Sequence, residues 1–130
     1  MIAFIFLCMF NLGCTSGDLS NCEFVKYGIE FQAKVGTKYC IDENNYIKIR
    51  EVRNELCPCG VTCFWEGQYV LELEVMANGK NYNFSKGSSN KVPDTSEFKE
   101  FNINFVKILP VYNCTNVSQK DYTVTLTLVK

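Results

Sequence analysis

Histidine is absent from all 130 residues of this chain. Histidine is the side chain that most often acts as a general base near neutral pH and that most often binds zinc or copper. Its absence removes the Ser-His-Asp and Cys-His nucleophile systems. We therefore predict that the protein is not an enzyme and that it holds no cofactor and no metal.

A strong excess of charge of either sign is also missing. The chain carries 13 Lys and Arg residues against 14 Asp and Glu residues. Proteins that bind nucleic acid through its phosphates need a basic surface, which this balance does not supply. We predict no nucleic-acid partner.

An amphipathic helix of useful length is the third absence, because apolar and polar residues alternate with a period of two through most of the chain. This alternation is typical of half-buried strands. The strands that it predicts cover residues 25–33, 38–41, 46–52, 71–75, 82–84, 101–108 and 122–128. Such strands bury their apolar faces most economically in two packed sheets. We predict an all-β fold, an antiparallel β-sandwich that is Ig-like in general architecture and stapled by disulfides, with a small closed β-barrel as the alternative.

Turn-forming residues separate these strands. Asp42-Glu43-Asn44-Asn45 has the composition of a turn, and residues 86–94 that of a loop. Asn78-Gly79 supplies the positive φ angles of a type I′ hairpin turn. The alternation slips at Val106–Ile108, which predicts a β-bulge there.

The first fourteen residues are almost wholly apolar and end in Leu12-Gly13-Cys14. This run is shorter than the roughly 20 apolar residues that a membrane-spanning helix needs, so it is typical of a signal peptide. It resembles the export signal of a bacterial lipoprotein, in which the cysteine after the cut receives a diacylglycerol. We predict a signal peptide over 1–13, lipid attachment at Cys14, a flexible tether over 14–22 and one β domain over 23–130. The membrane is then one partner, and the location is the bacterial cell envelope, anchored in the outer membrane on its periplasmic or surface face.

Loss of Cys8 with the signal and lipidation of Cys14 leave an even number of cysteines. These six are Cys22, Cys40, Cys57, Cys59, Cys63 and Cys114. An even set pairs completely in an oxidising compartment, so we predict disulfides. Two alternatives remain: a metal held by the cluster at 57–63 with a fourth thiolate from Cys40 or Cys114, and a redox motif at Cys57-Pro58-Cys59, which lacks the usual helix N-terminus.

A longer pattern surrounds this cluster. The segment from Phe31 to Val75 and the last two strands resemble a family of small bacterial envelope lipoproteins of uncharacterised function. The family motif is Cys-Pro-x-x-x-x-Cys-x-Trp-x-Gly, carried here by Cys57, Pro58, Cys63, Trp65 and Gly67. The resemblance implies a lipid-anchored β domain with no established activity. It also implies that Cys57 pairs with Cys63 and lays Trp65 onto the core.

Fixing that pair leaves four cysteines, which join in three ways. We favour Cys22–Cys114 and Cys40–Cys59, because the first and last strands of sandwiches often lie close together. Trp65 is expected in the core and Gly67 in a tight turn. An exposed Trp65 would instead make Trp65, Glu66 and Gly67 the leading candidate for a binding loop.

Three function classes follow from these observations. The first and favoured one is a binding or structural module whose loops at 86–94 and 57–67 contact a protein or a glycan. The second is a protease inhibitor that presents the disulfide-stiffened loop Pro58–Thr62, since a rigid loop lowers the entropy cost of binding. The third is an enzyme that uses Glu72 and Glu74 as a carboxylate pair, although alternating Glu residues on a strand are typical of a solvated face.

Overall fold

The computed structural model describes residues 22–89 and 98–130. Cys8, the predicted lipid site Cys14, the predicted tether before Cys22 and part of the loop at 86–94 lie outside the described residues. The elements in chain order are β1 (Cys22–Phe24), β2 (Phe31–Lys34), β3 (Lys38–Cys40), β4 (Tyr46–Leu56), β5 (Gly67–Ala77), β6 (Lys80–Gly87), β7 (Asn102–Leu109), the 3₁₀-helix η2 (Gln119–Asp121) and β8 (Thr123–Val129).

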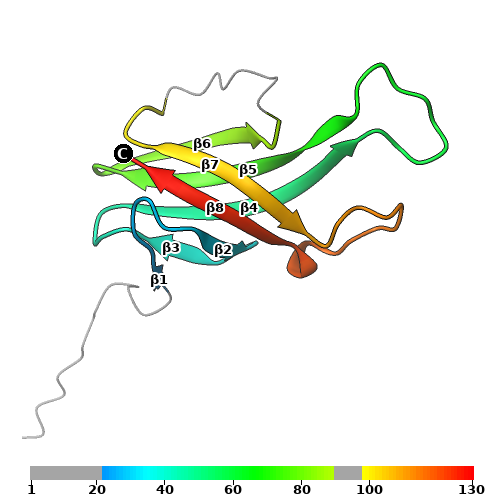
Figure 1. Ribbon diagram of the computed structural model, residues 1–130. Coiled ribbons are helices and arrows are strands. Elements are labelled where there is room, and N and C mark those ends of the chain that lie inside the picture. Colours follow the sequence, from blue (N-terminus) through cyan, green and yellow to red (C-terminus); the bar gives the residue numbers. More distant parts are fainter. Residues whose placement is uncertain (1–21, 90–97) are drawn as a thin grey trace, which may run out of the picture.

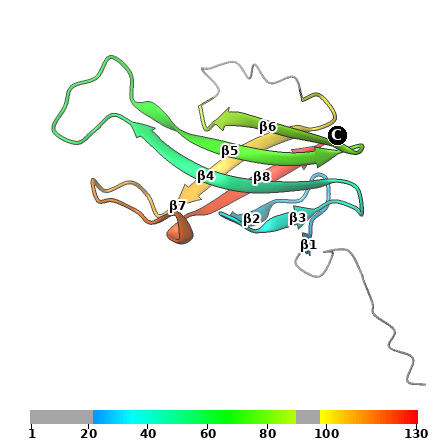
Figure 2. The same cartoon turned by 180° about the vertical axis from the view of Figure 1, so that it is seen from behind.

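These strands form two sheets that face each other (Figure 1). One sheet has the order β1-β3-β4-β5-β6 and the other the order β2-β8-β7, as the reverse view also shows (Figure 2). The predicted β-sandwich is therefore confirmed, and the strands of the described residues do not close into the alternative barrel. One pairing departs from the antiparallel rule, because β1 runs parallel to β3. The chain leaves the larger sheet for β2 and then returns, and these two reversals give β1 and β3 the same direction.

The core lies between the two sheets. The alternation on β5 places Leu71, Leu73 and Val75 fully inside, while Glu72 and Glu74 lie on the outer face. Aliphatic side chains from both sheets complete this layer: Ile47, Ile49, Val52, Val124, Leu126 and Leu128. Burial of each such side chain contributes about 1.5–3 kcal/mol, so this layer supplies the main driving force for folding.

The strand predicted over residues 25–33 is wrong over most of its length, because β1 ends at Phe24 and β2 begins only at Phe31. The chain turns between them at Gly28, which has a φ of +78°. The Gly28 N–H donates to the Leu128 carbonyl at 2.7 Å, so the turn is attached to the smaller sheet. Ile29, apolar in the pattern, is therefore exposed.

The predicted turns at 42–45 and 78–79 and the predicted β-bulge are confirmed. Asn78 and Gly79 have φ angles of +51° and +78°, as a type I′ hairpin turn requires. The register of β7 against β8 shifts between Phe105 and Lys107, which places the predicted bulge at Val106. At the turn over 42–45, Asp42 accepts a hydrogen bond from the Asn44 N–H at 2.8 Å.

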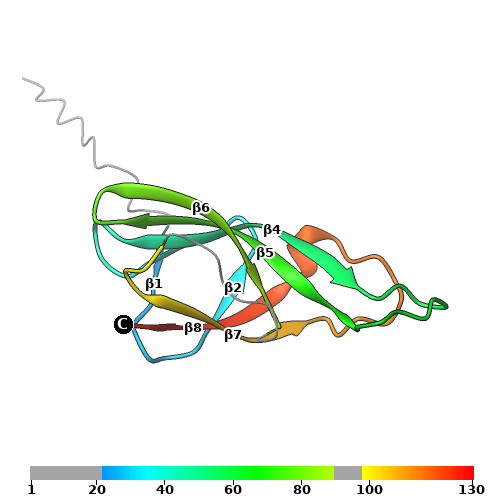
Figure 3. The same cartoon turned by 90° about the horizontal axis from the view of Figure 1, so that it is seen from above.

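The two ends of the sandwich differ. The described chain begins at one end with β1 and finishes near the same end after β8 (Figures 1 and 3). The β4–β5 connection and the β7–β8 connection project together at the opposite end (Figure 3). No helix within residues 22–89 and 98–130 has the length and apolar character that crossing a membrane requires.

Candidate functional site

Three disulfides join the six described cysteines: Cys22–Cys40, Cys57–Cys63 and Cys59–Cys114. The pairing of Cys57 with Cys63 that the family resemblance implies is confirmed. The favoured pairs Cys22–Cys114 and Cys40–Cys59 are wrong. Since β1 lies beside β3 in one sheet, Cys22 reaches Cys40, whereas Cys114 lies in the β7–β8 connection at the other end of the sandwich.

The β4–β5 connection is closed at its base. The strand ladder ends at the pair Leu56–Gly67, and the Cys57 N–H donates to the Glu66 carbonyl at 2.8 Å. The Cys57–Cys63 disulfide then forms a small ring inside this connection. Within the ring the Val61 N–H donates to the Pro58 carbonyl at 3.3 Å, which closes a turn.

The β7–β8 connection is fixed to the larger sheet at two places. The Gln119 carboxamide accepts a hydrogen bond from the Val52 N–H and donates one to the Val52 carbonyl, both at 2.8 Å. The second attachment is the Cys59–Cys114 disulfide. Cys114 adopts a φ of +71°, a conformation that costs a non-glycine residue about 1–3 kcal/mol and persists only where surrounding contacts impose it.

We call residues 57–66 and 109–118, together with the disulfide that joins them, the stapled tip. Its surface carries both apolar and uncharged polar side chains. Phe64 is fully exposed, and the other exposed apolar side chains of the tip are Val61, Trp65, Leu109 and Val111. Glu66 is the only charged residue in these two segments. The tip thus exposes two aromatic side chains and a single charged residue on a covalently fixed frame.

Trp65 does not lie in the core, contrary to the prediction. Its side chain is 48 % exposed, because it lies in the closed connection outside the strand ladder, where no opposing strand covers it. The candidate binding loop is therefore exposed at Trp65 and Glu66. Sequence reasoning included Phe64 and Val61 only as part of the loop 57–67, and it missed the second segment. The signal that could have found them is the absence of charge over residues 56–65 and 108–119.

Gly67 is required by the backbone geometry and is not part of the exposed binding surface. Its φ is +79°, and a Cβ placed there would lie 2.1 Å from the Glu55 carbonyl oxygen and 2.7 Å from the Leu56 Cα. The backbones of β4 and β5 approach each other so closely at this point that only glycine fits. The expected tight turn is thus a close approach at the start of β5.

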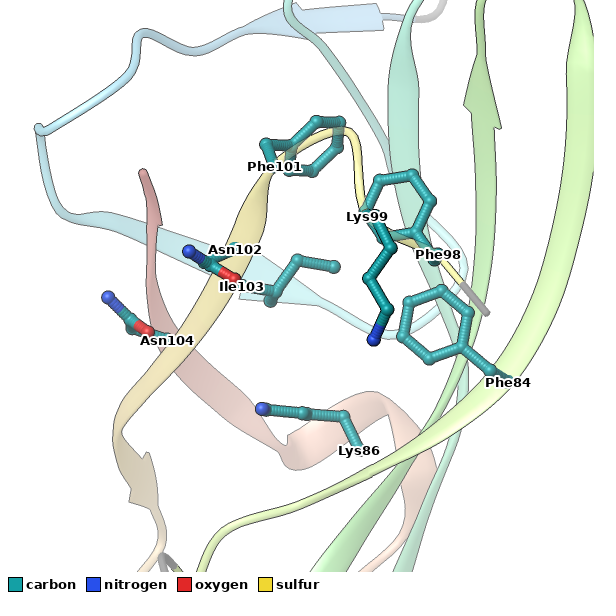
Figure 4. A pocket seen from close by; sticks show the side chains of 8 residues that line it. All are labelled: Phe84, Lys86, Phe98, Lys99, Phe101, Asn102, Ile103 and Asn104. Carbon is teal, nitrogen blue, oxygen red and sulfur yellow. The ribbon is translucent and has the colours of Figure 1, made fainter. Parts of the chain in front are cut away.

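A cavity of about 160 Å³ lies elsewhere, between β6 and β7 (Figure 4). Phe84, Phe98, Phe101 and Ile103 form its apolar part, and Lys86 and Lys99 also line it. Tyr82 donates a hydrogen bond to Glu100 Oε1 at 3.0 Å, and this bond lowers the pKa of the Glu100 carboxyl.

Glu72, one of the two carboxylates that could suggest catalysis, is engaged on the surface. Arg53 forms an ion pair with Glu72 at 2.8 Å, and the Ser85 hydroxyl donates to the same carboxylate at 2.8 Å. The six described cysteines are all in disulfides, so none of them offers a thiolate. In the described part of the chain, no three His, Cys, Asp or Glu side chains gather as a metal site would need.

No family model, curated protein or solved structure matches this chain significantly.

The disulfide pairing gives the first prediction. Proteolysis of the non-reduced protein, followed by mass spectrometry, should yield peptides linked as Cys22–Cys40 and as Cys59–Cys114 bridged to the Cys57–Cys63 ring. The β1–β3 pairing brings the first two cysteines together, and the stapled tip the others. Peptides that link Cys22 to Cys114 would contradict the pairing.

The close approach at Gly67 gives the second prediction. Gly67→Ala should lower the free energy of unfolding by about 3 kcal/mol or more, since it adds a backbone clash to an unfavourable φ. Gly60→Ala is the matched control, because Gly60 has a φ of +78° and open space around it. It should cost only about 1 kcal/mol. Equal midpoints for the two variants in urea unfolding would refute the close approach.

Proposed function

We propose that this protein is a lipid-anchored binding module of the bacterial cell envelope, and that it holds a protein partner through the stapled tip. The observation that carries the proposal is the exposure of Phe64 and Trp65 on a frame fixed by two disulfides. We assign no catalytic step to the chain.

The composition of the tip supports a protein partner. The buried centre of a protein interface is depleted of charge and enriched in Trp, Phe and Tyr. Contiguous apolar surface exposed on a folded domain is typical of an interaction site. The tip exposes two aromatic and three aliphatic side chains, and only one of its residues is charged.

The fixation of the tip also supports binding. A loop that is already ordered loses little conformational entropy when a partner binds, and this raises affinity. Here the Cys57–Cys63 ring, the Cys59–Cys114 disulfide and the contacts of Gln119 with Val52 order both segments before binding. Aromatic anchors on such a frame have the properties of binding hot spots.

The position of the tip fits an anchored protein. Seven residues, 15–21, separate Cys14 from β1. Fully extended, they span at most about 25 Å. A lipid on Cys14 would therefore hold the β1 end within that distance of the bilayer, and the tip lies at the opposite end of the sandwich (Figure 1). The oxidised cysteines are compatible with this compartment.

The alternative function, a protease inhibitor, has less support. A protease cleft binds its substrate as an extended strand. The loop Pro58–Thr62 is instead turned, because Val61 donates back to Pro58 and Gly60 has a positive φ. Its middle cysteine, Cys59, is tied to Cys114.

The binding role gives the third prediction. A photo-crosslinking residue in place of Phe64, introduced in the organism that makes the protein, should give one dominant protein adduct. Because Trp65 is half exposed, Trp65→Ala should cost only about 1 kcal/mol of stability, yet it should reduce that adduct at least tenfold. Western blotting of irradiated cells measures the adduct, and urea unfolding measures the stability.

Ile29 provides the matched control position, since it is 58 % exposed, as Val61 of the tip is at 57 %, and lies outside the tip. The crosslinking residue at Ile29 should not give the adduct. The same adduct from both positions, or an adduct that survives Trp65→Ala, would remove the tip from the binding role. Trp65→Ala that costs 3 kcal/mol or more would return Trp65 to a core role.

The anchor gives the fourth prediction. Metabolic labelling with an alkyne fatty acid should mark the wild-type protein and should fail on Cys14→Ala, because Cys14 is the one predicted site of diacylglycerol attachment. Cys14→Ala should also accumulate with residues 1–13 still attached. Equal labelling of the variant would contradict lipid attachment at this position.

A further inference from the structure

The two disulfides of the stapled tip cross each other in the sequence. Cys57 is joined to Cys63, and the cysteine between them, Cys59, is joined to Cys114. The third disulfide, in contrast, joins the first two described cysteines, which are neighbours in chain order. An oxidant that joins cysteines in the order in which they occur in the chain makes a pair of the second kind. It does not make the crossed pairs.

The unfolded chain favours the wrong partners for Cys59. The segment 57–63 contains three cysteines, whereas Cys114 is 55 residues from Cys59. The probability that two chain positions meet falls as about the −3/2 power of the loop length, so Cys59 meets Cys63 about 50 times more often than it meets Cys114. These four cysteines pair in three ways, and two of the three join Cys59 to a neighbour inside the segment. Oxidation before folding therefore gives mainly wrong pairs.

The ladder of β4 and β5 selects the pair Cys57–Cys63. It ends at Leu56–Gly67, on the two sides of the cysteine cluster. The Cys57 N–H then donates to the Glu66 carbonyl at 2.8 Å. The Cα atoms of Cys57 and Cys63 are thereby 6.0 Å apart, a distance within the usual range for a disulfide. This pair is favoured only once the two strands have formed their ladder.

The packing of the two sheets selects the pair Cys59–Cys114. Cys114 lies in the β7–β8 connection, which the Gln119 carboxamide attaches to Val52 of the larger sheet through two hydrogen bonds of 2.8 Å. Because β8 belongs to the smaller sheet, this attachment requires that the two sheets have already packed. The Cα atoms of the two cysteines are then 5.8 Å apart. Cys59 therefore reaches its partner late in folding, when wrong disulfides have already formed.

The cysteines that must exchange partners are accessible. Cys59, Cys63 and Cys114 are exposed even in the folded structure, so an attacking thiolate reaches them. We propose that this protein is a substrate of a thiol–disulfide isomerase, which converts wrong pairs of these cysteines into the two crossed disulfides. This maturation step goes beyond the binding role of the tip and does not depend on it.

The exchange needs no net oxidant. Starting from Cys57–Cys59 and Cys63–Cys114, the isomerase thiolate attacks Cys57 and releases the Cys59 thiolate. That thiolate attacks Cys114, forms Cys59–Cys114 and releases the Cys63 thiolate. The Cys63 thiolate attacks Cys57 of the mixed disulfide, forms Cys57–Cys63 and expels the isomerase thiolate. The chain holds two disulfides among these cysteines before and after, and the isomerase returns to its starting state.

Oxidative refolding of the full chain tests the proposal, with Cys8→Ala and Cys14→Ala so that only the six described cysteines react. The reduced, unfolded protein is diluted into buffer with diamide and no thiol; the diamide is then removed, and half of the sample receives a catalytic amount of reduced, purified disulfide isomerase. Reversed-phase chromatography separates the isomers, and mass spectrometry assigns their pairing. Without the isomerase, the crossed isomer should form no more than about a third of the product, since it is one of three pairings. The isomerase should raise that share at least twofold and make the crossed isomer the main product.

Two double variants are the matched controls. Cys57→Ala with Cys63→Ala, and Cys59→Ala with Cys114→Ala, each leave four cysteines whose native pairs are neighbours in chain order. Both variants should reach their native pairing to the same extent with and without the isomerase, and either one supplies the comparison if the other does not fold. The crossed isomer as the main product without the isomerase, or an equal gain from the isomerase in the controls, would overturn the proposal. Neither result depends on the binding role, because no partner of the tip is present.

Discussion

The disulfide between Cys59 and Cys114 joins two connections that leave different sheets, and the character of one whole end of the molecule depends on it. The two cysteines are 55 residues apart in the chain. In the chain-entropy treatment, a crosslink over that length lowers the conformational entropy of the unfolded state, which stabilises the fold by about 4 kcal/mol. Its structural effect is more specific, because it fixes two apolar segments against each other outside the core, where packing alone would leave them loosely held.

The remainder of the sandwich makes this arrangement possible. β4 and β5 are the longest strands, with 11 residues each, and they extend the larger sheet toward the tip. The bulge of β4 near Arg50 precedes Val52, whose backbone groups receive the Gln119 carboxamide. The β7–β8 connection therefore has a polar attachment to the larger sheet and a covalent one to the β4–β5 connection. With order supplied in this way, Phe64 and Trp65 need no role in the core and remain exposed.

Local patterns made much of the fold predictable from the sequence. The alternation over Leu71–Val75 and over Val124–Leu128 identified core strands, because burial of one face imposes a period of two. The hairpin turn at Asn78-Gly79 and the bulge at Val106 were also predictable, since each depends only on residues that are neighbours in the sequence. The break at Gly28 was not, because apolar alternation continues across it while the chain changes sheets.

The candidate site was harder to predict, because its determinants are distant in sequence. The pairing of Cys59 with Cys114 and the contact of Gln119 with Val52 depend on how two sheets are stacked, which alternation does not encode. The position of Trp65 depends on where the ladder of β4 and β5 ends. The predicted Trp65 core contact was implied by the family resemblance, in which the Cys57–Cys63 ring lays Trp65 onto the core. The ladder instead ends at Leu56–Gly67 and leaves Trp65 outside it.

Backbone ¹⁵N relaxation on the oxidised protein tests the ordered tip most directly. The amides of Val61 and Val111 should have order parameters near 0.85, as rigid strand residues have. In the Cys59→Ser, Cys114→Ser double variant, those of residues 111–115 should fall below about 0.6 while β4 and β5 remain rigid. Order parameters below about 0.6 in the wild-type tip, or values that do not change when the disulfide is removed, would contradict the account.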